Sequence, residues 1–193
     1  MNKPIQKRTL QTRARLLEAA RQVVEETGYP ALRTEEVVKR AGTAKGTFFA
    51  HFPDKDALMD HLIGADLDAI LDHMQAGSAP NSVVQLVESL MPLLRYMGAE
   101  REVFDVIIRR SGAAAIEDIG PIAKTFERQV VLLMQWLDNS AFRRDVGPDL
   151  LAEGVQAFVV QTIALNFCSL HNTVDLPDRL RPYLEAWLTP SPS

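Results

Sequence analysis

Apolar residues recur every three or four positions along most of the chain, which is the spacing of one face of an α-helix. Near the N-terminus, the segment TRARLLEAARQVVEETG carries such a stripe and is followed by helix-ending Gly28. The stripe consists of Leu16, Leu17, Ala20, Val23 and Val24. No segment alternates apolar and polar residues between hairpin turns. The pattern predicts an all-α protein.

Three short helices are predicted within the first 54 residues. The hydroxyl of Thr34 is suited to cap the second helix, and acidic Glu35 and Glu36 would lie in its first turn. Gly42 separates this helix from a third one over roughly 45–51. Glycine can adopt the positive φ that such a turn needs, so the pattern is that of a helix-turn-helix.

A long fourth helix follows, and further helices fill the rest of the chain. Asp54 is suited to cap the segment KDALMDHLIGADLDAILDHM, which is long enough to join an N-terminal unit to a larger body. Helical patterns then cover 82–97, 100–110, 121–138, 149–171 and 177–188. We therefore expect two domains, residues 1–54 and residues 55–193.

Charge is distributed unevenly between these two parts. Residues 1–55 hold 11 lysines and arginines against 6 acidic residues, a net charge of +5. Residues 56–193 hold the other 10 against 19, a net charge of −9. A basic N-terminal unit on an acidic body favours nucleic acid as the partner of that unit, although ordinary solvated charges would give the same count.

Other features argue against several classes of protein. No run of about twenty uncharged apolar residues is present, and the single cysteine, Cys168, cannot form an internal disulfide. These features favour a cytoplasmic protein without a membrane span. The chain contains no glycine-rich phosphate loop, nucleophile elbow or histidine-rich metal spacing. We expect no enzyme activity, cofactor or metal.

The stretch AGTAKGTFFAHFPDKDAL, residues 41–58, resembles the DNA-binding domain of TetR-type transcriptional regulators. That family has a basic first helix, a Thr-capped second helix ending in AG, a recognition helix similar to xGTxYxHF, and a lysine that opens the fourth helix. The matching residues are Ala41, Gly42, Gly46, Thr47, Phe49, His51, Phe52 and Lys55. Phe49 departs from the usual Tyr. Ala44 departs from a frequent capping Ser, so either Thr43 caps the helix instead or the cap is weak.

The resemblance implies a set of DNA contacts. Lys45 and Thr47 are expected at base edges or the nearby DNA backbone, and Arg33, Thr34 and Lys55 at phosphates. His51 either donates to a phosphate or interacts with the dipole at the end of its helix. The full candidate set is Arg33, Thr34, Thr43, Ala44, Lys45, Thr47, Phe49, His51 and Lys55. The basic arm, with Arg8, Arg13 and Arg15, either reaches the DNA backbone or is simply solvated.

The last two helices are expected to form a dimer interface, as in TetR-type proteins. The segment VQAFVVQTIALNF is apolar around most of its circumference, so one side would face its own domain and another a second subunit. The interface candidates are Phe158, Phe167, Leu180, Tyr183, Leu184 and Trp187. The alternative is a monomer in which both stripes pack internally.

An effector pocket in the body is also implied. Its candidate wall residues are Met91, Phe104, Ile108, Phe126, Met134 and Phe158, with the polar Gln161, Thr162 and Asn166. An ordinary core with satisfied polar groups would use the same residue types. Taken together, we expect a homodimeric regulator, a repressor that an unknown small-molecule effector releases from a near-palindromic double-stranded DNA operator. The alternative is an all-helical enzyme or interaction protein with a structural three-helix head.

Overall fold

The computed structural model describes residues 3–111 and 119–189, and within these ranges every regular element is helical. The helices are α1 (Lys3–Thr27), the short 3-10 turn η1 (Tyr29–Ala31), α2 (Thr34–Arg40), α3 (Lys45–Phe49), α4 (Lys55–Ala76), α5 (Val83–Ala99), α6 (Arg101–Arg110), α7 (Pro121–Leu137), α8 (Pro148–Asn166) and α9 (Leu176–Leu188). The all-α expectation is confirmed.

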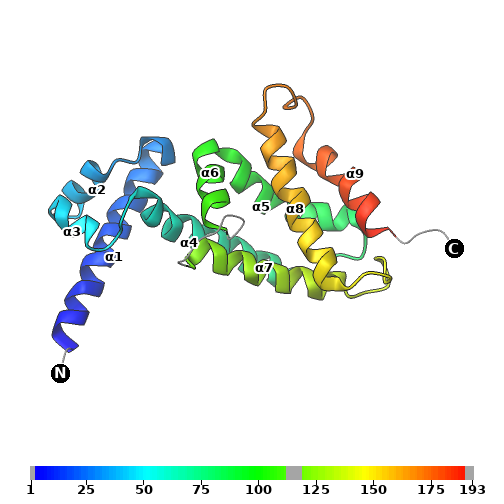
Figure 1. Ribbon diagram of the computed structural model, residues 1–193, viewed down its shortest axis with the longest axis horizontal. Coiled ribbons are helices and arrows are strands. Elements are labelled where there is room, and N and C mark those ends of the chain that lie inside the picture. The colour runs from blue at the N-terminus through cyan, green and yellow to red at the C-terminus, as the bar shows by residue number, and fades with distance from the viewer. Residues whose placement is uncertain (1–2, 112–118, 190–193) are drawn as a thin grey trace.

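The molecule is elongated, with the two chain ends at opposite ends (Figure 1). Helices α1, α2 and α3 form a head, and α5 to α9 form a body. Helix α4 runs from one to the other and packs against α1, α5, α6 and α7. No helix in the described part of the chain is long and apolar enough to cross a membrane.

Two glycines set the geometry of the head. Gly28 follows the last turn of α1 with a φ of 78°, and Gly42 joins α2 to α3 with a φ of 59°. A side chain at either position would be strained, because L-residues rarely adopt a positive φ. The predicted apolar stripe of α1 is buried at Leu16, Ala20 and Val23.

The predicted cap of α2 is wrong. Thr34 is the first residue of α2, and the cap position belongs to Arg33, whose backbone is extended and whose side chain makes no capping bond. The helix starts there because the Arg33 carbonyl accepts from the amides of Glu36 and Val37, both at 3.1 Å. The prediction for α4 is confirmed, since the Asp54 carboxylate accepts from the Ala57 amide at 2.7 Å.

A buried carboxylate fixes α7 on α4. Asp60 is 4% exposed, and its Oδ1 accepts from the Ile122 amide at 2.9 Å in the first turn of α7. A Cβ on Gly120 would lie 1.9 Å from Asp60 Oδ2, and one on Gly64 would lie 2.6 Å from Pro121 Cβ. Only glycine permits this close approach. Burial raises the pKa of Asp60, which the bond from Ile122 partly offsets.

A second polar network connects head and body. Asp66 of α4 accepts from Arg21 of α1 at 2.9 Å, from Tyr29 of η1 at 3.2 Å and from Tyr96 of α5 at 2.8 Å. Burial raises the pKa of both tyrosines, so their hydroxyls stay protonated as donors. The network therefore fixes α1 against the body through one carboxylate.

Helix α8 ends earlier than its apolar pattern predicts. The sequence pattern runs over 149–171, whereas α8 ends at Asn166 and the chain continues in turns. The Cys168 amide bonds the Leu165 carbonyl at 3.1 Å, which closes the helix end. Helix α9 then returns across α8, where a Cβ on Gly154 would lie 2.3 Å from the indole nitrogen of Trp187.

Candidate nucleic-acid interface

Helix α3 has one buried and one exposed face. Phe48 of α3 and Phe52, which lies beyond the helix end, are 0% and 1% exposed, with ring centroids 5.7 Å apart. The helix ends at Phe49, earlier than the predicted 45–51. Phe49 is 48% exposed and meets Phe48 edge-on at 5.4 Å. The outward surface of α3 therefore consists of Lys45, Gly46 and Phe49, with Thr47 half-buried beside them.

The N-terminus of α3 has no side-chain cap within the described residues. Ala44 occupies the cap position, and no side chain bonds the first amides of the helix. The cap from Thr43 is wrong, because its hydroxyl is buried and has no hydrogen-bond partner in the described part of the chain. The Ala44 carbonyl instead accepts from the amides of Thr47 and Phe48 at 2.9 and 3.3 Å, which starts the helix.

Lys45 is held by a carboxylate that the sequence analysis did not include among the site residues. Its ammonium donates to Glu35 Oε1 at 2.6 Å, and both side chains are more than half exposed, at 57% and 68%. The bond from Lys45 lowers the pKa of Glu35, so this carboxylate stays charged at neutral pH. The predicted base-reading lysine thus has an acidic neighbour on the same surface.

The Arg33 side chain bonds backbone carbonyls of the preceding turn. Its guanidinium donates to the Pro30 carbonyl at 2.7 Å and to the Leu32 carbonyl at 3.2 Å, which closes the turn between η1 and α2. Thr34 is half-buried at the first position of α2. Both residues lie at the start of α2, and their contacts with phosphates stay a prediction.

Arg13 points inward rather than to solvent. Its guanidinium lies 4.3 Å from the centroid of the Phe52 ring and donates to the His51 carbonyl at 2.8 Å and to His61 Nε2 at 2.5 Å. Burial, followed by the charge of Arg13, lowers the pKa of His61. Arg13 is therefore half-buried against the head, whereas Arg8 and Arg15 remain exposed.

Lys55 forms an ion pair with Glu102 of α6. Both side chains are 30% exposed, so the pair lies at the edge of the interface between head and body. Two further pairs join the same elements: Arg109 with Asp56 at 2.8 Å, and Arg110 with Asp54 at 3.2 Å. No local sequence signal connects α6 with the start of α4, which explains why these partners were not predicted.

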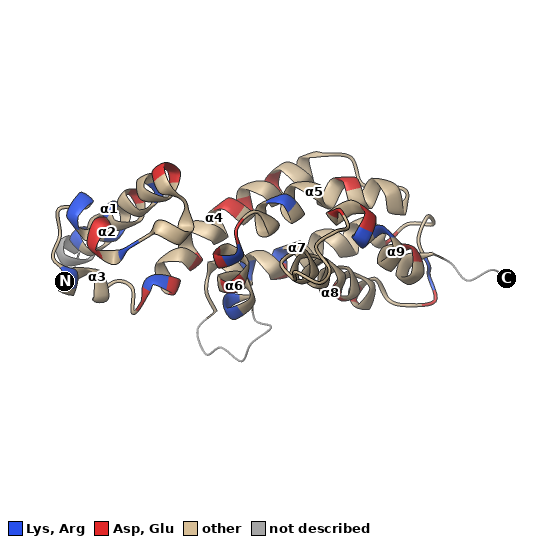
Figure 2. Ribbon diagram, turned by 90° about the horizontal axis from the view of Figure 1, so that it is seen from above, with Lys and Arg blue, Asp and Glu red and all other residues tan. Residues whose placement is uncertain are grey.

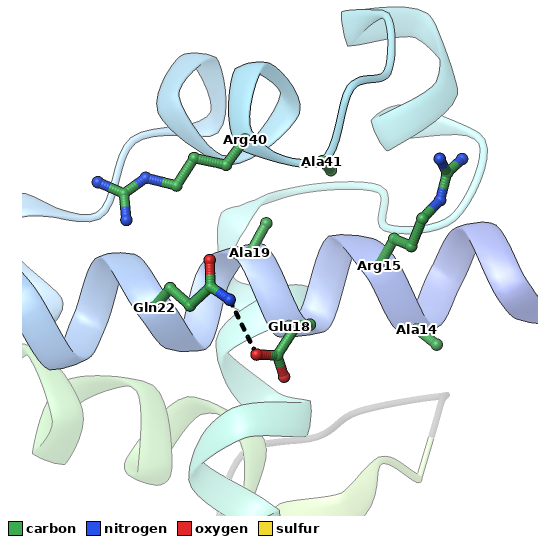
Figure 3. Close-up of a pocket in the computed structure, with 7 residues that line it drawn as sticks. All are labelled: Ala14, Arg15, Glu18, Ala19, Gln22, Arg40 and Ala41. Atoms are coloured by element: carbon green, nitrogen blue, oxygen red, sulfur yellow. Dashed lines mark hydrogen bonds between the residues drawn. The ribbon is translucent and has the colours of Figure 1, made fainter.

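A hollow of about 370 Å³ lies on the head between α1 and the end of α2 (Figure 3). The guanidinium groups of Arg15 and Arg40 point away from each other in this view, and Gln22 donates to Glu18 at 3.0 Å. Arg40 is fully engaged, since it bonds Glu26 and Glu36 at 2.6 to 2.8 Å. These bonds join α2 to α1.

Most predicted pocket residues belong to the core of the body. Met91, Ile108 and Met134 pack against it, and Phe126 is 9% exposed. Gln161 contradicts its assignment, because its side chain is exposed. Thr162 is fully buried, and its hydroxyl has no partner within the described chain. Phe104 lines a hollow of about 440 Å³ with Phe167 and Cys168, close to half-buried Asn166.

The predicted dimer residues divide into two groups. Leu180 and Leu184 are 0% exposed, so their assignment is wrong: α9 packs against α5 and α8 of its own chain and buries them there. Phe158, Tyr183 and Trp187 remain half-buried on the outer side, with the first two rings stacked at 5.2 Å. Phe167 packs instead on Phe104, with centroids 5.7 Å apart.

The geometry of α2, the Gly42 turn and α3 is that of a helix-turn-helix DNA-binding protein. Residues 16–62 match the family model for bacterial regulatory proteins of the tetR family. This match confirms the resemblance to TetR-type regulators over the head and the start of α4.

Individual relatives agree with this assignment. YvdT of Bacillus subtilis (strain 168), an uncharacterised HTH-type transcriptional regulator, is 38% identical over 60 residues, which cover 29% of this chain and 31% of YvdT. The chain thus spans about a third of that curated relative. Two solved structures show a similar fold at lower identity.

Salmonella enterica GusR is 23% identical, covers 93% of this chain and 96% of its own, and has a TM-score of 0.58. Thermus thermophilus FadR, a TetR-family transcriptional repressor solved with lauroyl-CoA, is 17% identical, covers 91% and 92%, and has a TM-score of 0.61. The whole chain, and not only its head, therefore has the fold of such proteins.

Proposed function

We propose that the chain is a homodimeric transcriptional repressor that binds a near-palindromic operator through α3 and leaves it when a small molecule binds the body. The observation that carries the proposal is the outward face of α3, where Lys45 and half-buried Thr47 adjoin the exposed Phe49 ring. A short helix with a buried aromatic side and a polar outer side fits the major groove.

Charge supports the same partner. In the head, lysines and arginines outnumber acidic residues, whereas in the rest of the chain acidic residues outnumber basic ones. Figure 2 shows acidic residues along α4 and on the body. Lys45, Thr47, Phe49 and His51 would face the groove or its edges, with Arg33, Thr34 and Lys55 at phosphates. We propose residues 1–54 as the DNA-binding domain and 55–193 as the ligand-binding and dimerisation domain, in a cytoplasmic protein.

A two-fold dimer would place two copies of α3 on one face of the DNA. The outer face of α8 and α9 supports this, because it leaves Ala157, Gln161 and Ala186 exposed beside the half-buried rings of Phe158, Tyr183 and Trp187. An exposed apolar face of this kind is typical of a subunit contact.

The effector is proposed to be a largely apolar small molecule. Thermus thermophilus FadR, which has a similar fold, was solved in complex with lauroyl-CoA, and this supports a ligand with a long apolar part. The fully buried Thr162 hydroxyl has no partner among residues 3–111 and 119–189, and such a group is a candidate for bonding a ligand. A ligand would act by binding the DNA-free conformation more tightly.

The test is selection of bound duplexes from a random DNA pool by the purified full-length protein, followed by gel shift with excess random competitor. The proposal expects an enriched near-palindrome that survives competition. The alternative, an enzyme or interaction protein with a structural head, expects no enrichment.

A further inference from the structure

We propose that Glu102 of α6 is an internal competitor of DNA for Lys55, so that the position of α6 sets how strongly the head binds phosphate. This inference rests on the proposed DNA-binding function. It concerns three consecutive residues at the start of α4 and three residues of α6, which together we call the charge clasp: Asp54, Lys55 and Asp56 with Glu102, Arg109 and Arg110.

The clasp is matched in charge at every position. Along α4 the order is acid, base, acid, and α6 supplies Arg110, Glu102 and Arg109 to them in turn. The two flanking pairs hold α6 against α4, while the central pair neutralises the one cation that α4 carries at this end. A neutralised lysine attracts a phosphate weakly, because the carboxylate beside it repels the same phosphate.

Lys55 remains within reach of a DNA strand. It is 30% exposed, and it lies in the first turn of α4, where backbone amides also favour an anion. Release of Glu102 would therefore give DNA a full positive charge at a position that already suits phosphate.

Glu102 has room to leave. A hollow of about 560 Å³ lies between η1 and α6, and Glu102 lines it with Pro30, Glu100, Arg101, Asp105 and Arg109. A small movement of α6 along α4 would let the carboxylate turn into this space and exchange its partner. Because α6 belongs to the body, the contact gives the body a direct electrostatic effect on the DNA-binding surface.

The experiment compares Glu102→Gln with Asp105→Asn in the full-length protein. Both changes remove one negative charge from α6, but among the described residues Asp105 pairs only with Arg101 of the same helix, at 3.8 Å. Binding of a selected duplex and of a random duplex is measured by fluorescence anisotropy over a range of salt. The same changes are made in a Lys55→Met background, and thermal unfolding by circular dichroism checks the fold.

We expect Glu102→Gln to tighten binding to both duplexes by roughly three- to tenfold. The slope of log K against log salt should steepen by about one, because one more lysine contacts phosphate. Asp105→Asn should change binding by less than about twofold, and Lys55→Met should abolish the gain from Glu102→Gln. If Glu102→Gln does not fold, Glu102→Asp, which withdraws the carboxylate by one CH₂, is used with the same expectations.

Equal effects of Glu102→Gln and Asp105→Asn would overturn the inference, as would a gain that persists without Lys55. A different result would contradict the proposed function itself: the unmodified protein would retain no duplex from the random pool.

Discussion

Arg13 shows how one side chain can join three parts of the head. It covers the Phe52 ring, donates to the His51 carbonyl and donates to His61 of α4. The last bond requires an unprotonated Nε2, so His61 must be neutral for the arrangement to hold. Arg13 of α1 and Lys124 of α7 oppose a charge on His61, and only Asp60 favours one.

The stability of the protein should therefore fall in mild acid. The pKa of His61 in the folded chain lies below its usual 6.5, so the unfolded chain binds the proton more tightly. The contribution of neutral His61 to the free energy of unfolding is complete above about pH 6.5. It is lost as the pH falls from there through the pKa of His61 in the folded chain. Urea unfolding at about pH 7.5 and pH 5 should show a smaller acid loss in His61→Gln than in the unmodified protein. Equal losses would exclude His61 as the cause.

Glu35 should lower the affinity for DNA and raise the specificity for the operator over random DNA. Its carboxylate pairs with Lys45 on the exposed face of the head, where it repels phosphates and restrains the lysine. Glu35→Gln should tighten binding to random DNA by roughly two- to fivefold, with a smaller change for the selected operator. Anisotropy on both duplexes checks this. Glu18→Gln, which changes a carboxylate of α1 that bonds Gln22, is the matched control, and an equal gain there would indicate a general charge effect.

At the scale of elements, local chemistry was the part that sequence could predict. Gly42 at the turn and Asp54 at the cap follow from backbone conformation and side-chain chemistry within a few residues. The cap by Thr34 failed because an extended Arg33 fixes the helix start one residue earlier. The partner of Lys55 could not be predicted, since Glu102 lies 47 residues away. Leu180 and Leu184 were misassigned because an apolar stripe does not reveal which chain covers it.

The crossing of α8 and α9 depends on a glycine. A Cβ on Gly154 would lie 2.3 Å from Trp187 Nε1, an atom that also donates to the Leu151 carbonyl at 3.2 Å. Gly154→Ala should lower the free energy of unfolding by about 1–3 kcal/mol, because the indole must move.

Gly98→Ala is the matched control for this crossing. Its added Cβ would meet nothing closer than 3.6 Å, so it should raise stability by up to about 1 kcal/mol through helix propensity. Urea unfolding of both variants checks the pair of predictions. Stabilisation by Gly154→Ala would show that the two helices cross with more space than described.

For the whole molecule, the proposed dimer depends on the outer face of α8 and α9. Ala157→Glu and Ala186→Glu would each place a charge on this face at an exposed position, so neither should disturb the fold of the single chain. Light scattering after gel filtration should show a monomer for each. Val131→Glu changes a residue that is 51% exposed on α7, and it should leave the dimer intact. A dimer that survives both alanine changes would move the interface elsewhere.

The central claim is that the outward face of α3 reads DNA, and Thr47→Ala tests it most directly. The change removes a half-buried hydroxyl and a methyl group from this face and leaves the buried Phe48 and Phe52 untouched. We predict that binding to the selected operator weakens by roughly five- to thirtyfold, whereas binding to random DNA of equal length changes by less than about twofold. Equal weakening on both DNAs, or none on either, would contradict the placement of α3 in the major groove.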